Sequence, residues 1–514
     1  MASAGAAARP NISAPETMDS SDDVYDLLVI GGGTAGLVCA AGAASLGART
    51  ALVERDRLGG ECLWTGCVPS KALVSSGRLA SEMQRASDFG LPAAGDPVDP
   101  ARDGGTVLDS VRTARGRIQP HDDPDRFREM GVDVWEGEPA RFLSDHEVVV
   151  GDRRLGGRKI VIATGSRPRI PPVPGLEEAG FFTHETAFDR DSIPGSVVIL
   201  GAGAVGVEFA QAYSRLGVEV TLVEMAPRVL PAEDEEVSAA VESILEDEGV
   251  RVLTSARAVE ARAAGEGRRE LVVTDGRDEQ SEPAPDDERR PVAADEIFVA
   301  AGRRPNLDGL GLDRIGVEAG EEGIIVDDRL RTTRSHIYAA GDVVGGYQFT
   351  HVADHEARTV VRNALFPFSS KVDYSVIPWA VFSDPEVARV GLTESEAREE
   401  HGDDVGVYRY DVSHLDRAIT ERSARGMVKL IGDGGGRLLG GHVVAPSAGT
   451  MIVELALAMR EGTTIGELSD LVHPYPTMSE GIRRAANEYS RSRLTPTVRS
   501  WLDRWFRLAR KLGL

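Results

Sequence analysis

The sequence has 514 residues, with 58 Lys+Arg against 82 Asp+Glu for a formal net charge of −24, and only three Cys. This length has room for two to four domains with ample cores. So acidic a chain repels phosphate backbones and anionic lipid, which argues against general nucleic-acid binding. Three Cys cannot build the disulfide framework of a secreted scaffold, so we expect a cytoplasmic protein in which any disulfide serves chemistry.

The N-terminal 23 residues lack a charged region followed by a continuous apolar core, so they do not read as a secretory signal. We expect residues 1–23 to form a disordered extension, with Met18 as an alternative start. Apolar runs such as 196–200 are too short to span a bilayer. Only five of the 58 cations are Lys, which is typical of a protein in a high-salt cytoplasm, although a base-composition bias of the genome would also raise Arg.

A nucleotide-binding unit is predicted from residue 26 onward. An apolar strand over 26–30 leads into a turn with Gly31, Gly33 and Gly36, then into an Ala-rich helix and a strand that ends at Glu54. The first Gly permits the sharp turn, the second lets the backbone approach a pyrophosphate, and the third lets helix and strand pack closely. The helix N-terminus stabilises phosphate charge and the Glu accepts from ribose hydroxyls.

Two of the three Cys lie in the next segment, GGECLWTGCVPSK at 59–71. Cys62 and Cys67 are flanked by Gly and followed by Lys71, whereas Cys39 on the preceding helix is interpreted as buried packing. A four-residue spacer on one helical turn allows two thiols to meet, and a helix end with a nearby cation lowers a thiolate pKa. Buried packing is therefore not the interpretation that fits Cys62 and Cys67.

A second copy of the unit follows. A strand over 196–200 leads into Gly201, Gly203 and Gly206, and each downstream acid, Glu54 or Glu224, lies 18 residues past the third Gly of its copy. A further echo links 160–168 with 297–305, which contain Gly165 and Gly302 respectively. We interpret these repeats as an internal duplication of a dinucleotide-binding α/β unit and expect two bound dinucleotides.

Residues 277–291 are charged, Pro-containing and apolar-free, so we expect a solvated loop without a function of its own. From about residue 376 the chain shows mixed strand and helix patterns, including a strand over 426–431 and an apolar helix over 450–460. These patterns predict a separate α+β domain.

Together the motifs resemble the class I pyridine nucleotide-disulfide oxidoreductases, a family that includes dihydrolipoyl dehydrogenase, glutathione reductase and mercuric reductase. The resemblance covers about 24–487 and also rests on YAAGD at 338–342, FSDPEVA at 382–388 and HPYPTMSE at 473–480. It implies an α/β fold with two Rossmann-like domains, for FAD and NAD(P), and a C-terminal α+β dimerisation domain in a homodimer. The expected domains are 24–166 with 303–372 for FAD, 167–302 for NAD(P), 373–489 for dimerisation, and a tail at 490–514.

The resemblance also implies roles for single residues. In the family, hydride passes from nicotinamide to flavin and the flavin reduces the disulfide, so Cys67 would face the flavin and Cys62 would exchange with substrate. Lys71 matches the family ion pair with Glu208, for which a surface Glu is the alternative. We assign no resident metal ion, and the expected cofactor-binding residues are Gly31, Gly33, Gly36, Glu54, Lys71, Gly165, Gly201, Gly203, Gly206, Glu224, Gly302, Asp342 and His351. Glu224 favours NADH because a carboxylate repels a 2′-phosphate, although Arg228 leaves dual use open.

One departure from the family concerns the acid/base residue near the C-terminus. Where the family has a His paired with a Glu five positions later, this chain has Tyr475, with Glu480 retained. Tyr has a reference pKa near 10 and is a poor base at neutral pH. Because both neighbouring Pro residues favour extended geometry, we expect His473 to project toward the same side as Tyr475. His473 would then partly substitute for the family His, directly or through water, while Tyr475 orients substrate. The alternative is a solvated His473 at a strand end.

The motifs do not name the substrate. We expect an NAD(P)H-dependent flavoprotein of the mercuric-reductase-like branch that acts on a disulfide, a dithiol or a metal ion. Mercuric reductase also uses a C-terminal Cys pair, and here Cys67 is the last Cys, so no second set of soft ligands delivers the ion. The alternatives are dihydrolipoyl dehydrogenase, a redox sensor that does not turn over, and a membrane-surface quinone or metal reductase.

The tail inverts the composition of the chain. From residue 491 onward it holds seven cations and one acid, a net charge of +6 against −30 for the remainder. Its apolar residues recur at three and four, which predicts an amphipathic helix. We expect the helix to dock on its own acidic body or across a dimer, and the alternative is peripheral contact with an anionic membrane surface.

Overall fold

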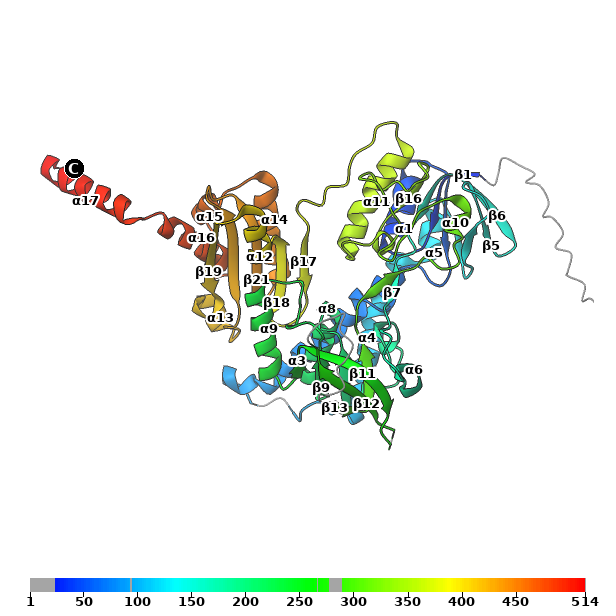
Figure 1. Ribbon diagram of the computed structural model, residues 1–514, viewed down its shortest axis with the longest axis horizontal. Coiled ribbons are helices and arrows are strands. Elements are labelled where there is room, and N and C mark those ends of the chain that lie inside the picture. Colours follow the sequence, from blue (N-terminus) through cyan, green and yellow to red (C-terminus); the bar gives the residue numbers. More distant parts are fainter. Residues whose placement is uncertain (1–23, 93–94, 266, 277–288, 514) are drawn as a thin grey trace, which may run out of the picture.

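The computed structural model describes residues 24–92, 95–265, 267–276 and 289–513 and has an α/β architecture with five sheets (Figure 1). The predicted extension 1–23 lies outside the described residues, and so does 277–288 of the predicted loop. Arg290 and Pro291 belong to strand β13 and pair with Val273 and Val272. The predicted loop therefore ends earlier than expected, because its last residues complete an antiparallel ladder.

The first sheet carries the N-terminal nucleotide-binding unit, with strand order β3-β2-β1-β6-β5-β4 and β16 beside β6. Its strands are β1 (Val24–Ile30), β2 (Thr50–Glu54), β3 (Val132–Glu136), β4 (Ala140–Phe142), β5 (Glu147–Val150), β6 (Arg153–Ile162) and β16 (Ile337–Ala339). Leu27 and Val29 of β1 pack toward α1 (Thr34–Ser45) and α11 (Thr350–Leu365). Leu28 and Ile30 pack on the other face, with β5 and the short helix α10 (Leu312–Ile315). Burial on both faces explains why this parallel strand is apolar without alternation.

The second unit repeats this plan with a four-stranded parallel sheet in the order β10-β9-β8-β14. Its strands are β8 (Ser196–Leu200), β9 (Glu219–Val223), β10 (Arg251–Leu253) and β14 (Glu296–Val299), flanked by α8 (Ala204–Arg215) and α9 (Glu235–Asp247). An antiparallel sheet of β11 (Ala256–Ala263), β12 (Arg269–Asp275) and β13 (Arg290–Ala294) covers the other face. The duplication inferred from the sequence is therefore a duplication of structure.

Two links join the units. The echo segments pair with each other, because β7 (Ser166–Pro168) and β15 (Arg303–Pro305) form a two-stranded antiparallel sheet. In addition, α2 (Gly60–Trp64) leads into α3 (Cys67–Gln84), which with α4 (Pro100–Ile118) shares an apolar core with α8. At Gly77 of α3 an added Cβ would lie 3.0 Å from the backbone oxygen of Ala212 of α8, so the two helices approach closely. This packing brings the start of α3 next to the start of α8.

The C-terminal part contains a five-stranded antiparallel sheet in the order β17-β18-β21-β20-β19. Its elements are β17 (Pro378–Val381), β18 (Glu386–Gly391), α12 (Glu394–His401), β19 (Val405–Asp411), α13 (Asp416–Thr420), β20 (Met427–Asp433), β21 (Leu438–Ala445), α14 (Ala448–Glu461), α15 (Ile465–Asp470) and α16 (Glu480–Ser492). The predicted α/β class with a C-terminal α+β domain is confirmed.

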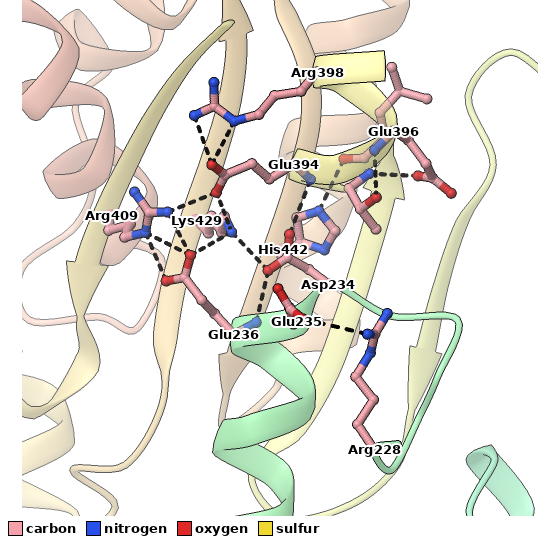
Figure 2. Close-up of polar contacts among 12 residues, drawn as sticks. Arg228, Asp234, Glu235, Glu236, Glu394, Glu396, Arg398, Arg409, Lys429 and His442 are labelled. Atoms are coloured by element: carbon pink, nitrogen blue, oxygen red, sulfur yellow. Dashed lines mark hydrogen bonds and ion pairs between the residues drawn. The ribbon is translucent and has the colours of Figure 1, made fainter. Parts of the chain in front are cut away.

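A buried cation joins this sheet to the second unit (Figure 2). Lys429 of β20 is 1% exposed, and its Nζ donates to Asp234 at 2.8 Å and to Glu236 at 2.7 Å. Asp234 is the N-cap of α9, and Glu394 of α12 lies 2.8 Å from the same Nζ. Burial alone would lower the pKa of Lys429, but hydrogen bonds from its ammonium to the three carboxylates raise it. The cluster fixes the start of α9 on the C-terminal sheet.

The remaining elements are shorter or peripheral: η2 (Ala86–Phe89), η3 (Gln119–Asp122), α5 (Pro124–Glu129), α6 (Leu176–Ala179), α7 (His184–Ala187), η4 (Asp342–Val344), η5 (Val412–His414) and α17 (Pro496–Leu512). Helix α17 extends away from the rest of the chain (Figure 1), and none of its residues is buried. The predicted tail helix forms, but it does not dock on its own body. Within the described ranges no helix is both long and apolar enough to cross a bilayer.

Candidate active site

One large cavity contains most of the predicted site residues. Its volume is about 2800 Å³, and it is lined by both glycine turns, both Cys of the pair, Lys71 and Glu208. Typical small-molecule sites measure roughly 300–1,000 Å³. The cavity therefore has room for more than one dinucleotide-sized ligand on a continuous surface.

The first glycine turn has the shape of a phosphate cradle. Gly31 has φ +109, and an added Cβ would lie 2.2 Å from the backbone oxygen of Ala163. At Gly36 an added Cβ would lie 1.8 Å from the oxygen of Gly31, so helix and turn are in contact. At Gly33 the nearest atom to an added Cβ is the Cα of Gly60 at 3.9 Å, so the space there is nearly open. Helix α1 begins after Gly33 with no side-chain cap, which leaves its first N–H groups available to an anion.

The second turn reproduces this geometry. Gly201 has φ +106, a Cβ at Gly206 would lie 1.9 Å from the oxygen of Gly201, and nothing lies within 4 Å of a Cβ at Gly203. Helix α8 begins after Gly203, again without a side-chain cap. Two uncapped helix N-termini behind open glycines fit two pyrophosphates.

The carboxylates of Glu54 and Glu224 each accept a hydrogen bond from the glycine turn of their own unit. Glu54 accepts from the N–H of Gly32 at 2.6 Å, and Glu224 accepts from the N–H of Ala202 at 2.6 Å. Each carboxylate accepts a second backbone N–H two residues downstream, from Asp56 and from Ala226. Both carboxylates line the cavity, and each oxygen has a further lone pair with which to accept from a ribose hydroxyl.

The Cys pair lies in the cavity wall at the junction of α2 and α3. Cys62 and Cys67 are both thiols, in hydrogen-bond contact, and Thr350 Oγ1 lies 3.2 Å from the Sγ of Cys67. The hydrogen bond from Cys62, aided by Thr350 and Lys71, outweighs burial and lowers the pKa of Cys67 to about 6. The hydrogen bond to Cys67 and burial raise the pKa of Cys62. Cys67 is also the first residue of α3, where the helix dipole favours a thiolate.

One helical turn beyond Cys67, Lys71 forms an ion pair with Glu208 of α8. Its Nζ lies 3.0 and 2.8 Å from the two carboxylate oxygens, and Glu208 is 5% exposed. The N–H of Phe382 donates to the same carboxylate at 2.9 Å, and the Nζ lies 4.5 Å from the centre of the Phe382 ring. The alternative of a surface Glu is wrong, because the packing of α3 on α8 buries this side chain.

A polar network beside the Cys pair was not anticipated from the sequence. Arg303 forms a bidentate ion pair with Glu61 and donates to Asp342 at 3.0 Å. Ser166 donates to the same oxygen of Asp342 at 2.6 Å. Burial alone would raise the pKa of Glu61, but hydrogen bonds from His184 and Arg303 lower it to about 2. The signal was present, since Arg303 lies in the echo segment and Glu61 precedes Cys62, but sequence alone does not join them.

Gly165, Gly302 and His351 also line the cavity. The two glycines have φ +67 and +98 and immediately precede the paired strands β7 and β15. The Nε2 of His351 lies 2.8 Å from the backbone oxygen of Pro378, and burial lowers the pKa of its ring. Arg228, by contrast, is directed to Pro231 and Glu235 (Figure 2) and is not among the residues that line the cavity.

The C-terminal acid/base candidates do not line the cavity of the single chain. The side chain of His473 is 4% exposed, and its Nε2 lies 3.1 Å from Glu454 of α14. Tyr475 is 70% exposed and donates to Asp416 at 2.7 Å, while the buried Glu480 accepts from Arg483. The expectation that His473 and Tyr475 share a side is wrong, because each contacts a different helix. The alternative of a solvated His473 is also wrong, because its ring is buried.

Away from the cavity, ligand atoms of Asp145, His146 and His336 lie within 4.8 Å of one another. The two rings stack at 4.0 Å, and each directs one nitrogen to a backbone oxygen, of Gly157 or of Asp145. These bonds explain the cluster as a link between two turns, and we assign it no metal ion.

Known proteins resemble this chain over most of its length. The family model described as pyridine nucleotide-disulphide oxidoreductase matches residues 25–357, and the model of that family's dimerisation domain matches 377–486. A mercuric reductase from Lysinibacillus sphaericus is 34% identical over 468 residues, which cover 91% of this chain and 83% of the relative. A dihydrolipoyl dehydrogenase from Bacillus subtilis is 33% identical over 474 residues, which cover 90% and 97%.

Among solved structures, the HOCl-induced flavoprotein disulfide reductase RclA from Escherichia coli has a TM-score of 0.78 at 28% identity, covering 90% of this chain and 99% of that one. The matches thus extend over nearly the whole chain, including the segments that contain the glycine turns, the Cys pair and the C-terminal sheet. The chain belongs to the pyridine nucleotide-disulphide oxidoreductase family, whose cofactors are FAD and NAD(P)H.

Proposed function

We propose that this protein is a homodimeric, NAD(P)H-dependent flavoprotein reductase that uses Cys62 and Cys67 to reduce a small disulfide or a thiophilic metal ion. One observation carries the proposal: Cys67, at the N-terminus of α3, lies one turn from the Lys71–Glu208 ion pair in a cavity that both glycine turns also line. In this arrangement the turn at Gly31 would hold FAD and the turn at Gly201 the nicotinamide nucleotide. When bound, the two cofactors supply electron pairs.

The chain's own part of the reaction is thiol–disulfide exchange. Deprotonated Cys62 attacks one sulfur of the substrate disulfide and releases the first thiol, so that a mixed disulfide forms. The Cys67 thiolate then attacks the Sγ of Cys62 and releases the second thiol. The substrate gains two electrons and two protons as the Cys62–Cys67 disulfide forms. Bound FAD and NAD(P)H would supply the electron pair that restores the dithiol. Lys71 and the helix dipole stabilise the Cys67 thiolate until it attacks Cys62.

A metal-ion substrate would use the same two sulfurs, because soft thiolates are the preferred ligands of thiophilic ions. The mercuric reductases among the relatives support this candidate. The dihydrolipoyl dehydrogenases support the alternative of a dithiol substrate with NAD⁺. Glu224 supports NADH over NADPH in either case, because its carboxylate lines the cavity and repels a 2′-phosphate.

The second subunit is proposed to complete the site at Cys62. Val453 of α14 lines the cavity and is 57% exposed, and the neighbouring surface includes Leu457 and Val472, which are 60% and 90% exposed. A second copy seated on this apolar patch would reach the cavity. Tyr475 is the better candidate for that contact, as a hydrogen-bond donor, because it is 70% exposed whereas the side chain of His473 is 4% exposed.

Steady-state turnover with NADH tests the proposal. The substrate panel is lipoamide, oxidised glutathione, mercuric ion and a soluble quinone, and each is measured with Cys62→Ser and with Cys39→Ala as the matched control. We expect turnover of a disulfide or of mercuric ion that Cys62→Ser abolishes and Cys39→Ala retains. Quinone reduction that survives Cys62→Ser as the sole activity would point instead to a flavin-level reductase, and no turnover of any substrate to a sensor.

A further inference from the structure

The C-terminal helix α17 is unusual because no part of the described chain packs over it so as to bury a residue. No residue of Pro496–Leu512 is buried, and Figure 1 shows the helix projecting beyond α16 and away from the sheets. Thr495 caps it by accepting from the N–H of Val498 at 3.3 Å, and Pro496 occupies its first position. Most of the stability of helices in proteins comes from packing of an amphipathic face, so an undocked helix with these end signals is suited to a surface that it binds.

Its side chains divide into two faces. With 3.6 residues per turn, the apolar residues share one side of the helix and the charged residues the other. The apolar face consists of Val498, Trp501, Leu502, Trp505, Phe506, Leu508, Ala509 and Leu512, and the polar face holds Arg499, Ser500, Asp503, Arg504, Arg507, Arg510 and Lys511. Trp501, Trp505, Phe506 and Leu512 are 64%, 48%, 54% and 65% exposed, so the apolar face is open to solvent.

The position of the cations decides between a protein and a lipid partner. Arg499 and Arg510 border the apolar face beside Phe506, and Arg504 and Lys511 border it beside Leu508, so both edges are cationic. The acidic body of a second copy would attract the polar face, but burial of the apolar face on that copy would turn the polar face to solvent. At an anionic lipid surface the apolar face enters the interface while the bordering cations meet headgroups on both sides.

We propose that α17 lies in the surface of an anionic lipid bilayer and attaches the enzyme to it. The remainder of the chain, at −30, is repelled by such a surface. However, α17 is about 26 Å long and projects outward, and charge repulsion is screened over a Debye length of about 8–10 Å. The helix thus carries the local positive charge to the lipid while the acidic body stays in solution.

Vesicle co-sedimentation of the purified holoenzyme tests the proposal, with vesicles of phosphatidylcholine alone or mixed equally with phosphatidylglycerol. We expect binding to the mixed vesicles that raised salt weakens and that truncation after Leu494 removes. Arg504→Glu, Arg507→Glu and Arg510→Glu together should lower partitioning at least about tenfold. The matched replacement of the same three residues by Lys should retain it.

Equal recovery of full-length and truncated protein with the mixed vesicles would overturn the proposal. So would a tail-dependent change of association state in sedimentation velocity without lipid, because the partner would then be a second copy. Neither measurement involves catalytic turnover, so failure of lipid binding and failure of the proposed reductase activity are separate results.

Discussion

The redox pair shows most directly how local groups set chemistry. The sequence does not show how the pKa values of the two thiols differ. In the structure Cys67 lies at a helix N-terminus, near the hydroxyl of Thr350 and near Lys71, whereas Cys62 is partly buried and lies beside the Cys67 thiolate. The pKa values of the two thiols are therefore driven apart. Cys67 is therefore a thiolate at neutral pH, whereas Cys62 must lose its proton before it can attack a substrate disulfide.

Thr350→Val should raise the pKa of Cys67 from about 6. The hydroxyl is a hydrogen-bond donor to the thiolate, and such bonds to charged groups contribute about 1.5–3 kcal/mol. One pKa unit is about 1.36 kcal/mol, so a rise of about one to two units is expected. The measurement is the pH dependence of iodoacetamide alkylation of the reduced protein. Thr350→Ser keeps the hydroxyl and should leave the pH dependence of alkylation unchanged. An unchanged pH dependence for Thr350→Val would show that Thr350 does not lower the pKa of Cys67.

Glu356 is a second group with a shifted pKa. Its buried carboxyl group accepts from the N–H of Gly341, the residue before Asp342. It is 2% exposed, and burial raises its pKa to about 7 against hydrogen bonds from Tyr374 and the N–H of Gly341. Because the folded pKa exceeds the unfolded value, the folded state binds more protons between about pH 4.5 and 7. The stability that this group confers is complete below that window and is lost as pH rises through 7.

Glu356→Gln should therefore flatten the pH dependence of unfolding in this window. The difference in unfolding free energy between variant and parent should change by about 3 kcal/mol from pH 4.5 to 8, in favour of the variant at the higher pH. Denaturant titrations at several pH values measure it. Parallel stability curves for the two proteins would mean that Glu356 does not titrate there.

At the scale of elements, the sequence predicted the structures formed by consecutive residues and did not predict contacts between residues far apart in the chain. Both strand–turn–helix units and both glycine turns were predicted, because turn geometry and apolar patterning are written into consecutive residues. The packing of α3 on α8, which makes the Lys71–Glu208 ion pair, joins positions 137 residues apart. That pair was inferred only through family resemblance, and the Arg303 network was not inferred at all. The position of His473 was wrong because extended geometry does not specify which helix a side chain meets.

The Lys429 cluster is the clearest junction between elements. Replacement of a buried cation leaves Asp234, Glu236 and Glu394 without their shared donor (Figure 2), and removal of one partner of a buried ion pair costs about 3–5 kcal/mol. Lys429→Met should therefore lower the thermal midpoint strongly. Lys371→Met is the matched control, since Lys371 is 66% exposed beside Asp328 and such pairs contribute about 0–1 kcal/mol. Equal midpoints for the two variants would show that the cluster does not hold α9 in place.

In the whole molecule, the negative charge, the positive charge and the exposed apolar patch lie in different regions. The body is strongly acidic, the tail is basic, and the apolar patch of Val453, Leu457 and Val472 lies on the C-terminal domain at the edge of the cavity. Composition predicted the first two, because charge can be counted along a chain. It could not predict the patch, whose members come from a helix and a loop that meet only in the fold. The patch is where the proposed dimer would complete each active site.

Mixing of inactive variants tests whether two chains share one site. Cys62→Ser lacks the attacking thiol and Tyr475→Ala lacks the hydrogen-bond donor proposed to come from the second subunit, so each homodimer should be inactive or nearly so. In a two-fold dimer, a mixed pair contains one site with both defects and one site with neither. After unfolding and refolding at equal concentrations, half the dimers are mixed and about a quarter of parental activity should return. Mixing without refolding is the control, and no recovery in refolded mixtures that contain heterodimers would place the whole site within one chain.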